Sequence, residues 1–189
     1  PSGKLTDTWP VNFDDNPSSA TFANNDGNTA QEVYNDDIFV GYRYYDTFGK
    51  DVAYEFGYGG SYTKFAMNTQ SVTADKDKVT VKVKVKNTGT VSGKEVAEVY
   101  FSAPEGNLDK PYQELAGYAK TDELAPGESQ VLTITYDTTE MGSYDTDKAA
   151  YVMEDGDYII RVGNSSRNTH VAGKISVAED TITEQYSNL

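Results

Sequence analysis

Residues 79–86 read VTVKVKVK, and the turn residues Asn87-Thr88-Gly89 follow them. Valines and polar residues alternate here at a strict period of two, as side chains do on the two faces of a β-strand. One face of this strand is therefore apolar, and the other carries threonine and lysine. The pattern predicts a half-buried strand whose valine face is covered by a second layer.

Further short runs of the same kind follow along the chain. Ala97, Val99 and Phe101 form the next apolar set, after a turn at Ser92-Gly93. We expect this set to form a hairpin with the valine strand. About seven short strands, with turn signals about every 8–12 residues, predict an all-β chain built on an antiparallel, immunoglobulin-like β-sandwich. The later runs of strand character are at residues 132–136, 149–153, 158–162 and 171–177, and one helical turn is expected within residues 137–144.

Residues 1–63, here called the arm, have a different character. Residues 11–36 are polar and show no hydrophobic period, and a loop of that length is usually functional or lies across a partner. Residues 37–46, DIFVGYRYYD, are mixed aromatic and apolar and are expected to be a strand or an extended segment. Residues 54–63, YEFGYGGSYT, are expected to turn the chain into the next domain. The tyrosines of the arm are therefore predicted to dock between two parts of a larger protein.

Three regions are expected: the arm, a sandwich over residues 64–177, and a polar tail or linker over residues 178–189. The net charge of −14 and the pI near 4.3 argue against nucleic acid and anionic membranes as partners. The chain has no cysteine, which suits the cytoplasm or bacterial secretion equally, so its location stays open. It has no 18-residue apolar run, no initiator Met and no signal stretch, and we expect it to be a segment of a longer protein.

No metal or cofactor site is predicted. A calcium loop needs oxygen ligands at alternate positions, and residues 24–27 (NNDG) and 153–156 (MEDG) both fail that spacing. His170 is the only histidine, so a zinc site or a Ser-His-Asp triad is not expected. The triplet Asn164-Ser165-Ser166 matches a glycosylation acceptor, although a tight exposed turn explains it as well.

Two kinds of residue in the arm are of the types that proteins use to bind or cleave sugars. Glycoside chemistry needs two carboxylates across a bond, but acidic residues are so common here that we expect no catalytic residue among the four near aromatic residues, namely Asp36, Asp37, Asp46 and Glu55. Tyr42, Tyr44 and Tyr45 are the candidates for substrate binding, by stacking on sugar rings. The alternative, which we favour, is that these tyrosines pack a domain junction.

Several motifs, taken in order, resemble the family 3 glycoside hydrolases, and β-glucosidases in particular. The segment 37–46 is similar to that family, as is PSGKL at residues 1–5 with the following Trp9-Pro10. In residues 54–63, Gly60 replaces the Leu that is usual in the family. The later matching motifs are residues 85–90 (VKNTGT), 93–96 (GKEV), 108–111 (LDKP), 114–118 (ELAGY), 124–129 (LAPGES) and 158–163 (YIIRVG).

The resemblance implies a fibronectin type III-like sandwich, preceded by the end of an α/β-sandwich domain and a connecting arm. It implies a retaining β-glycosidase as the parent, with its nucleophile on a barrel domain and its acid/base on the α/β sandwich. Neither motif occurs in this chain, so no catalytic residue is carried over and the chain alone is expected to be inactive.

The expected function is that of a non-catalytic accessory domain of a bacterial family 3 β-glucosidase, which buttresses the catalytic domains. Its expected partners are the barrel and α/β-sandwich domains, and possibly a β-glucan or oligosaccharide. The alternative is a carbohydrate-binding module that uses exposed tyrosines. Some family members carry the barrel after this domain, and the tail from Ala178 would then suit a linker.

Overall fold

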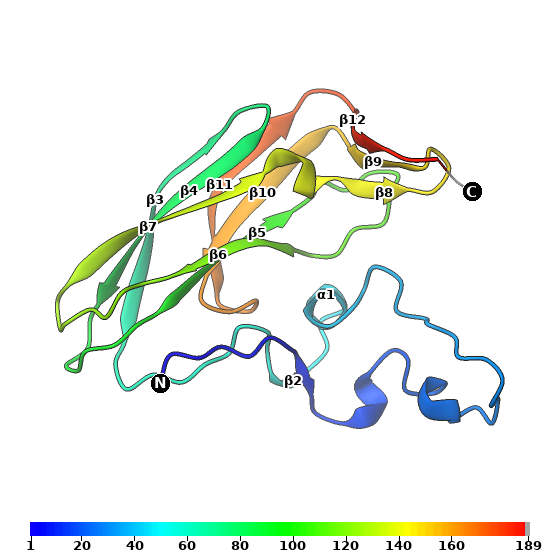
Figure 1. Cartoon of the computed structure of the whole chain (residues 1–189), viewed down its shortest axis with the longest axis horizontal. Coiled ribbons are helices and arrows are strands. Elements are labelled where there is room, and N and C mark those ends of the chain that lie inside the picture. Colours follow the sequence, from blue (N-terminus) through cyan, green and yellow to red (C-terminus); the bar gives the residue numbers. More distant parts are fainter. Residues whose placement is uncertain (188–189) are drawn as a thin grey trace.

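Two antiparallel sheets pack face to face in the computed structural model, which describes residues 1–187 (Figure 1). One sheet has the strand order β3-β4-β7, and the other has the order β11-β10-β5-β6. This arrangement confirms the prediction of an all-β sandwich. The strands are β3 (Phe65–Ala74), β4 (Lys78–Asn87), β5 (Val96–Ser102), β6 (Glu114–Lys120), β7 (Ser129–Asp137), β10 (Gly156–Gly163) and β11 (Thr169–Val177).

The valine face of β4 lies at the centre of the core. Val79, Val81, Val83 and Val85 are all fully buried, while the lysines between them face solvent. Across the sandwich they meet the buried apolar side chains of β5 and β10. The period of two therefore gave the correct faces for this strand, because one face packs against a second sheet.

The hairpin predicted between the valine strand and β5 is wrong. β4 pairs with β3 and β7, whereas β5 lies in the opposite sheet between β10 and β6. Both strands turn their apolar faces toward the same core from opposite sides. Alternation along two strands predicts burial but does not distinguish neighbours in one sheet from partners across two sheets.

A third, smaller sheet extends one end of the sandwich in the order β12-β9-β8 (Figure 1). Its strands are β8 (Ser143–Asp145), β9 (Ala150–Met153) and β12 (Thr181–Gln185). β12 lies within the tail and pairs with β9, so this part of the tail is ordered against the sandwich. A 3-10 helix at Thr138–Met141 confirms the helical turn expected before β8.

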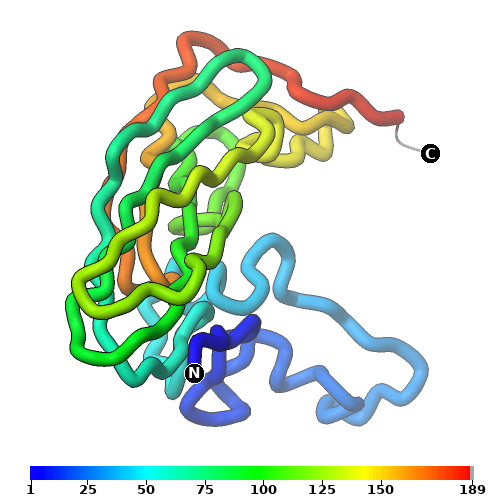
Figure 2. Tube along the Cα trace, turned by 60° about the vertical axis from the view of Figure 1, so that its left-hand side comes forward, coloured from blue at the N-terminus to red at the C-terminus, as the bar shows by residue number. Residues whose placement is uncertain are grey.

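The arm runs beneath one end of the sandwich and loops out beyond it (Figures 1 and 2). Its regular elements are β1 (Trp9–Pro10), paired with β2 (Val52–Tyr54), two 3-10 helices at Phe13–Asp15 and Phe22–Asn24, and α1 (Tyr42–Thr47).

The prediction of a strand or extended segment over residues 37–46 is wrong where α1 begins. Gly41, at φ 59°, precedes the helix, and Tyr42 and Tyr45 then lie three residues apart on one helical face. Tertiary packing of that face outweighs the β-propensity of the aromatic residues.

Candidate docking interface

The arm and the sandwich are joined along a contact that we call the seam. Lys4 reaches across it, with its Nζ 3.0 Å from the Glu95 carboxylate and donating a 2.9 Å hydrogen bond to the Asn164 carbonyl. The side chains of Lys4 and Glu95 are only 13% and 11% exposed. An ion pair this far from water depends on its partner, because either charge alone would be left desolvated.

Backbone hydrogen bonds hold residues 56–58 in place, two of them within the arm and one across the seam. The Leu5 amide donates to the Tyr58 carbonyl at 2.8 Å, and the Gly57 amide donates to the Leu5 carbonyl at 2.9 Å. The Ser166 amide of the sandwich donates to the Phe56 carbonyl at 2.9 Å. Three successive arm residues, 56–58, are thus tied to other segments by their main chain.

Gly57 lies directly over a buried carboxylate. Its φ is +79°, and a Cβ at this position would be 2.5 Å from Oε2 of Glu98. The Tyr100 hydroxyl donates a 2.6 Å hydrogen bond to the same oxygen. Burial raises the pKa of Glu98, although the hydrogen bond from Tyr100 opposes the shift. Burial, and then the charge of Glu98, raise the pKa of Tyr100.

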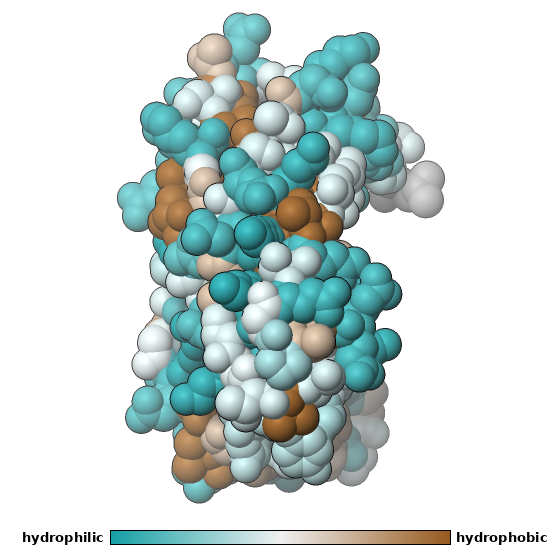
Figure 3. All heavy atoms as spheres, turned by 90° about the vertical axis from the view of Figure 1, so that its left-hand side faces the viewer, coloured by the Kyte–Doolittle hydropathy of each residue, from teal (hydrophilic) through white to brown (hydrophobic). Residues whose placement is uncertain are grey.

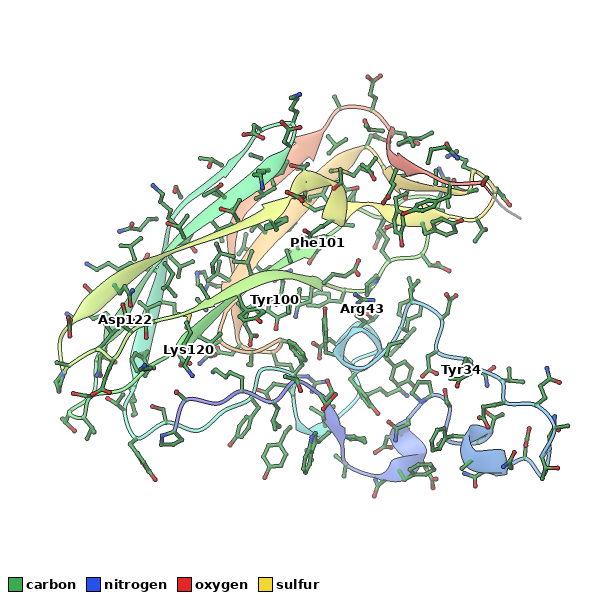
Figure 4. All side chains as sticks on the ribbon, in the orientation of Figure 1. Tyr34, Arg43, Tyr100, Phe101, Lys120 and Asp122 are labelled. Carbon is green, nitrogen blue, oxygen red and sulfur yellow. The ribbon has the colours of Figure 1, made fainter. Side chains whose placement is uncertain are left out.

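The first turn of α1 packs an aromatic ring into the seam. The Tyr42 ring centroid lies 4.9 Å from that of Phe56 and 6.0 Å from that of Tyr100, which Figure 4 shows on the arm-facing side of the sandwich. The Tyr42 hydroxyl accepts a 2.8 Å hydrogen bond from the Leu115 amide of β6. Burial raises the pKa of Tyr42, so the neutral phenol is the form held there.

The other two candidate tyrosines pack within the arm. Tyr45 is only 2% exposed, and its hydroxyl donates a 2.8 Å hydrogen bond to the Asn16 side chain. The Tyr44 ring centroid lies 5.2 Å from those of Tyr45 and Phe48. The geometry of Tyr42 is that of a packed junction residue, whereas the Tyr45 side chain is packed inside the arm. Sugar binding by Tyr42, Tyr44 or Tyr45 stays a prediction.

Two further ion pairs cross the seam at α1. Arg167 Nε lies 2.8 Å from an Asp46 carboxylate oxygen, and the same guanidinium donates a 2.6 Å hydrogen bond to the Lys50 carbonyl. Arg43, which points from α1 toward the sandwich in Figure 4, pairs with Glu114 at 3.2 Å. Sequence reasoning missed both pairs, because the partners are far apart in the chain and carry no local pattern.

Two of the remaining candidate carboxylates accept hydrogen bonds from serine hydroxyls. Glu55 accepts a 3.0 Å hydrogen bond from the Ser165 hydroxyl, and Asp36 accepts one from the Ser18 hydroxyl. Asp37 is exposed at a left-handed φ of 48°.

His170 and the glycosylation triplet also have local partners. His170 Nε2 lies 3.3 Å from the Thr69 hydroxyl. The Asn164 amide nitrogen donates a 3.2 Å hydrogen bond to Glu95, so it is already engaged at the seam.

Within residues 1–187, no group of three or more His, Cys, Asp or Glu side chains is placed to hold a metal ion. The helices in the same part of the chain are too short or too polar to span a membrane.

The arm also has an apolar face that no part of the described residues 1–187 covers. A cavity of 630 Å³ opens in it, and Tyr34 at its edge is 84% exposed and lies far from the sandwich in Figure 4. By contrast, the side of the sandwich shown in Figure 3 is largely hydrophilic, with isolated apolar residues. Large exposed apolar patches typically mark interaction sites. The exposed apolar residues that line this cavity are Phe13, Phe22, Val33, Tyr34 and Val40.

Known proteins share the fold of this chain. Residues 95–166 match the model of the fibronectin type III-like domain. The chain is 39% identical to β-glucosidase A of Butyrivibrio fibrisolvens over 211 residues, covering all of this chain and 25% of the relative. It is 41% identical to a β-glucosidase of Ruminococcus albus, covering 98% of this chain and 20% of the relative. Relatives also occur in fungi.

Solved structures agree with these relatives. A β-glucosidase from Paenibacillus barengoltzii superposes with a TM-score of 0.92 and 44% identity, over all of this chain and 22% of that protein. β-Glucosidase 3B from Thermotoga neapolitana superposes with a TM-score of 0.90 and 43% identity, over 97% of this chain and 26% of that protein. Because the arm is included in both superpositions, its position against the sandwich is shared.

Fold and seam together define a fibronectin type III-like domain that carries an ordered N-terminal arm. The chain corresponds to the C-terminal region of the family 3 β-glucosidases, which confirms the resemblance drawn from its motifs. It spans about a quarter or less of the length of the relatives described above.

Proposed function

We propose that this chain is the accessory part of a family 3 β-glucosidase, and that it buttresses the catalytic domains through its arm. The observation that carries the proposal is the uncovered apolar face of the arm. The part that this chain matches is only 25% or 20% of each relative, so three-quarters or more of each relative is available to cover that face. The expected partners are the barrel and α/β-sandwich domains of the parent.

The contacts of the seam indicate separate roles for the arm and the sandwich. The Lys4–Glu95 pair, the Tyr42 packing and the Asp46–Arg167 pair hold the arm rigidly on the sandwich. A rigid arm presents its apolar face without a large ordering cost on docking. The sandwich then supports the arm in its docked position. The catalytic reaction is carried out by the other domains of the parent enzyme.

Matched substitutions test this proposal in two contexts. Phe13→Ser combined with Phe22→Ser removes two exposed rings of the apolar face. In the 189-residue chain the pair is expected to change the free energy of unfolding by less than about 1 kcal/mol, since each residue is already 55% exposed. In the complete parent enzyme it is expected to cost on the order of 3 kcal/mol, because the rings would be buried there.

The control is Val171→Ser, an exposed apolar residue on β11 of the sandwich. It is expected to have little effect in either context. Equal small effects of the Phe13/Phe22 pair in the chain and in the parent enzyme would reject the docking surface.

The alternative of a carbohydrate-binding module has weaker support from the arm. Tyr45 is buried and Tyr42 packs against Phe56 and Tyr100, so neither offers an open stacking platform. Exposed tyrosines elsewhere include Tyr62 and Tyr118. Titration of the chain with β-glucan oligomers, read by tyrosine fluorescence of Tyr62→Ala and Tyr118→Ala variants, tests this alternative.

A further inference from the structure

Three successive lysines face solvent on the central strand of one sheet. Lys82, Lys84 and Lys86 alternate with buried valines on β4, and we call them the lysine row. Alternate residues of a strand lie about 6.8 Å apart on one face, so the three charges are evenly spaced along β4. The valine side of β4 packs against the other sheet, to which the arm is attached through β6, so the lysine row points away from both (Figure 1).

No acidic side chain balances the lysine row. Within residues 1–187, none of its three lysines forms an ion pair. Lys78, on the same strand, does pair with Asp137 directly opposite it, at 3.2 Å. Like charges in one row repel each other, and the opposite positions offer nothing to offset that repulsion. The residues opposite the row on β3 and β7 are Ser71, Asn68, Ala66, Thr133, Val131 and Ser129.

Neither protection of a sheet edge nor solubility accounts for the row. Lysines often guard edge strands against pairing with other chains, but β4 is flanked by β3 and β7. A net charge far from zero keeps a protein soluble, and here 30 acidic residues against 16 basic ones already supply it. Each lysine of the row reduces that net charge. The row is therefore a positive surface on an acidic chain, and its charge is complementary to that of a negatively charged partner.

The other side chains of this sheet face limit the class of that partner. Ser129, Thr133 and Thr135 are exposed on β7, and their hydroxyls can donate and accept hydrogen bonds with a hydroxyl-bearing chain. The aromatic residues of the three strands, Phe65 and Tyr136, pack into the core, and the strands contain no arginine. The face therefore lacks the stacking groups with which proteins hold the bases of single-stranded nucleic acid.

The spacing of the row suits a polymer with sparse negative charge. Duplex DNA carries one charge per about 1.7 Å, far denser than one lysine per about 6.8 Å. The net charge of −14 would also repel so dense a polyanion. A polyuronate carries only one carboxylate on each sugar unit, together with hydroxyl groups.

We propose that the lysine row binds an extended acidic polysaccharide of the polyuronate class. The ammonium groups of the row contact its carboxylates, and the serine and threonine hydroxyls of β7 contact its hydroxyls. The row lies on a different face from the arm, so the inference does not depend on how the arm meets the parent enzyme.

The test is a titration of the ¹⁵N-labelled 189-residue chain with an oligogalacturonate long enough to span the row, followed by amide chemical shifts. A saturable shift is expected at residues 80–86 and at the facing residues of β7, with a Kd that increases as salt screens the charges. The matched ligand is the methyl ester of the same oligosaccharide, which keeps the sugar and removes the charge. It is expected to bind at least about tenfold more weakly. The absence of a saturable shift, or equal binding of the ester, would overturn the proposal.

Single-stranded DNA and phosphatidylserine vesicles test the other sources of negative charge. Both are expected to bind more weakly than the oligogalacturonate. Tighter binding of either one at residues 80–86 would overturn the polyuronate class.

Variants locate the site. Replacing all three lysines of the row by glutamine is expected to raise the Kd at least about tenfold, because exposed ion pairs are weak singly but act together here. Val131→Glu places a carboxylate opposite Lys84 and is expected to raise the Kd about threefold. Its melting temperature should be unchanged or higher, since a cross-strand ion pair forms.

The control is a second triple variant with the same change in net charge. It replaces three exposed lysines outside this sheet by glutamine and is expected to keep a Kd within about twofold of wild type. An equal rise in both triple variants, or unchanged binding in the variant of the row, would reject the lysine row as the site. The three control lysines are Lys50, Lys148 and Lys174.

Discussion

Lys4, near the start of the chain, lies 3.0 Å from Glu95 at the edge of the sandwich. Both side chains are nearly withdrawn from water, and Asn164 donates to Glu95 while its carbonyl accepts from Lys4. This pair fastens the first residues of the arm to β5 and to the turn after β10. It makes the arm part of one folded body with the sandwich.

Lys4→Ala should loosen the arm. Removing one partner of a mostly buried ion pair leaves the other charge desolvated, and we expect a loss of about 3 kcal/mol in the free energy of unfolding. Denaturant unfolding measures that loss, and limited proteolysis should show faster cleavage within residues 1–57. The matched control is Lys76→Ala, whose contact with Asp77 is exposed, and its effect should stay below about 0.5 kcal/mol. Equal protease resistance of Lys4→Ala and wild type would contradict the role of the pair.

Gly57→Ala should displace the arm locally. The new Cβ would lie 2.5 Å from Glu98 Oε2 and 2.8 Å from the Ser165 Cα, at a φ of +79°. Both the clash and the left-handed backbone oppose it, and we expect a cost on the order of 3 kcal/mol. Gly60→Ala is the control, because no atom lies within 4 Å of its Cβ position. Thermal melts of the two variants should differ clearly, and identical melting temperatures would show that the close approach at Gly57 is absent.

Val83→Asp tests the strand register. Val83 is fully buried between Thr69 of β3 and Leu132 of β7, so an unpaired carboxylate there should cost more than about 4 kcal/mol and unfold the domain. Val131→Asp, on the exposed face of β7, is the control and should fold normally. Circular dichroism compares them. A cooperative, wild-type-like melt of Val83→Asp would mean that the opposite face of β4 is the buried one.

The buried Glu98 should make stability depend on pH. Burial raises its pKa in the folded protein above the ordinary value of 4.5, so the folded state holds the proton more tightly than the unfolded state. The free energy of unfolding contributed by this group is therefore largest below pH 4.5 and falls as pH rises through the raised pKa. Glu98→Gln should remove that fall and be more stable than wild type at pH 7.

Unfolding curves from pH 4 to 8 measure the Glu98 effect. The difference between Glu98→Gln and wild type should grow with pH, while Glu123→Gln, on the exposed surface, should run parallel to wild type. A difference that is constant with pH would show that Glu98 does not titrate abnormally. Lys174 and then Ser176 lower the pKa of Asp157, so its effect on the free energy of unfolding appears at lower pH. Asp157 is present in wild type and in both variants, so its effect cancels when they are compared.

Sequence patterns predicted the sandwich well where one physical rule dominates. The valines of β4 alternate because one face is buried, and the 3-10 turn before β8 and the strand β9 were also expected at the right places. The pairing of β4 and β5 was not predictable, because alternation describes faces and not neighbours. β3 was missed altogether, since its half-buried face mixes Phe65, Met67 and Thr69 and gives a weak signal.

The site was predictable only in outline. The tyrosines of the arm indicated a junction, and Tyr42 does pack against Tyr100 of the sandwich. The individual contacts, such as Asp46 with Arg167 or Gly57 over Glu98, join residues that are distant in the chain. Such pairs are decided by tertiary structure, so a single sequence carries no local signal for them.

Reconstitution in trans tests the central claim most directly. The 189-residue chain would be mixed with the remainder of its parent enzyme, produced without these residues, and followed by sedimentation velocity. The account predicts a single complex that the Phe13→Ser/Phe22→Ser chain forms much more weakly, while the Val171→Ser chain matches wild type. Two species that sediment separately at every ratio, or a complex indifferent to the apolar face of the arm, would contradict it.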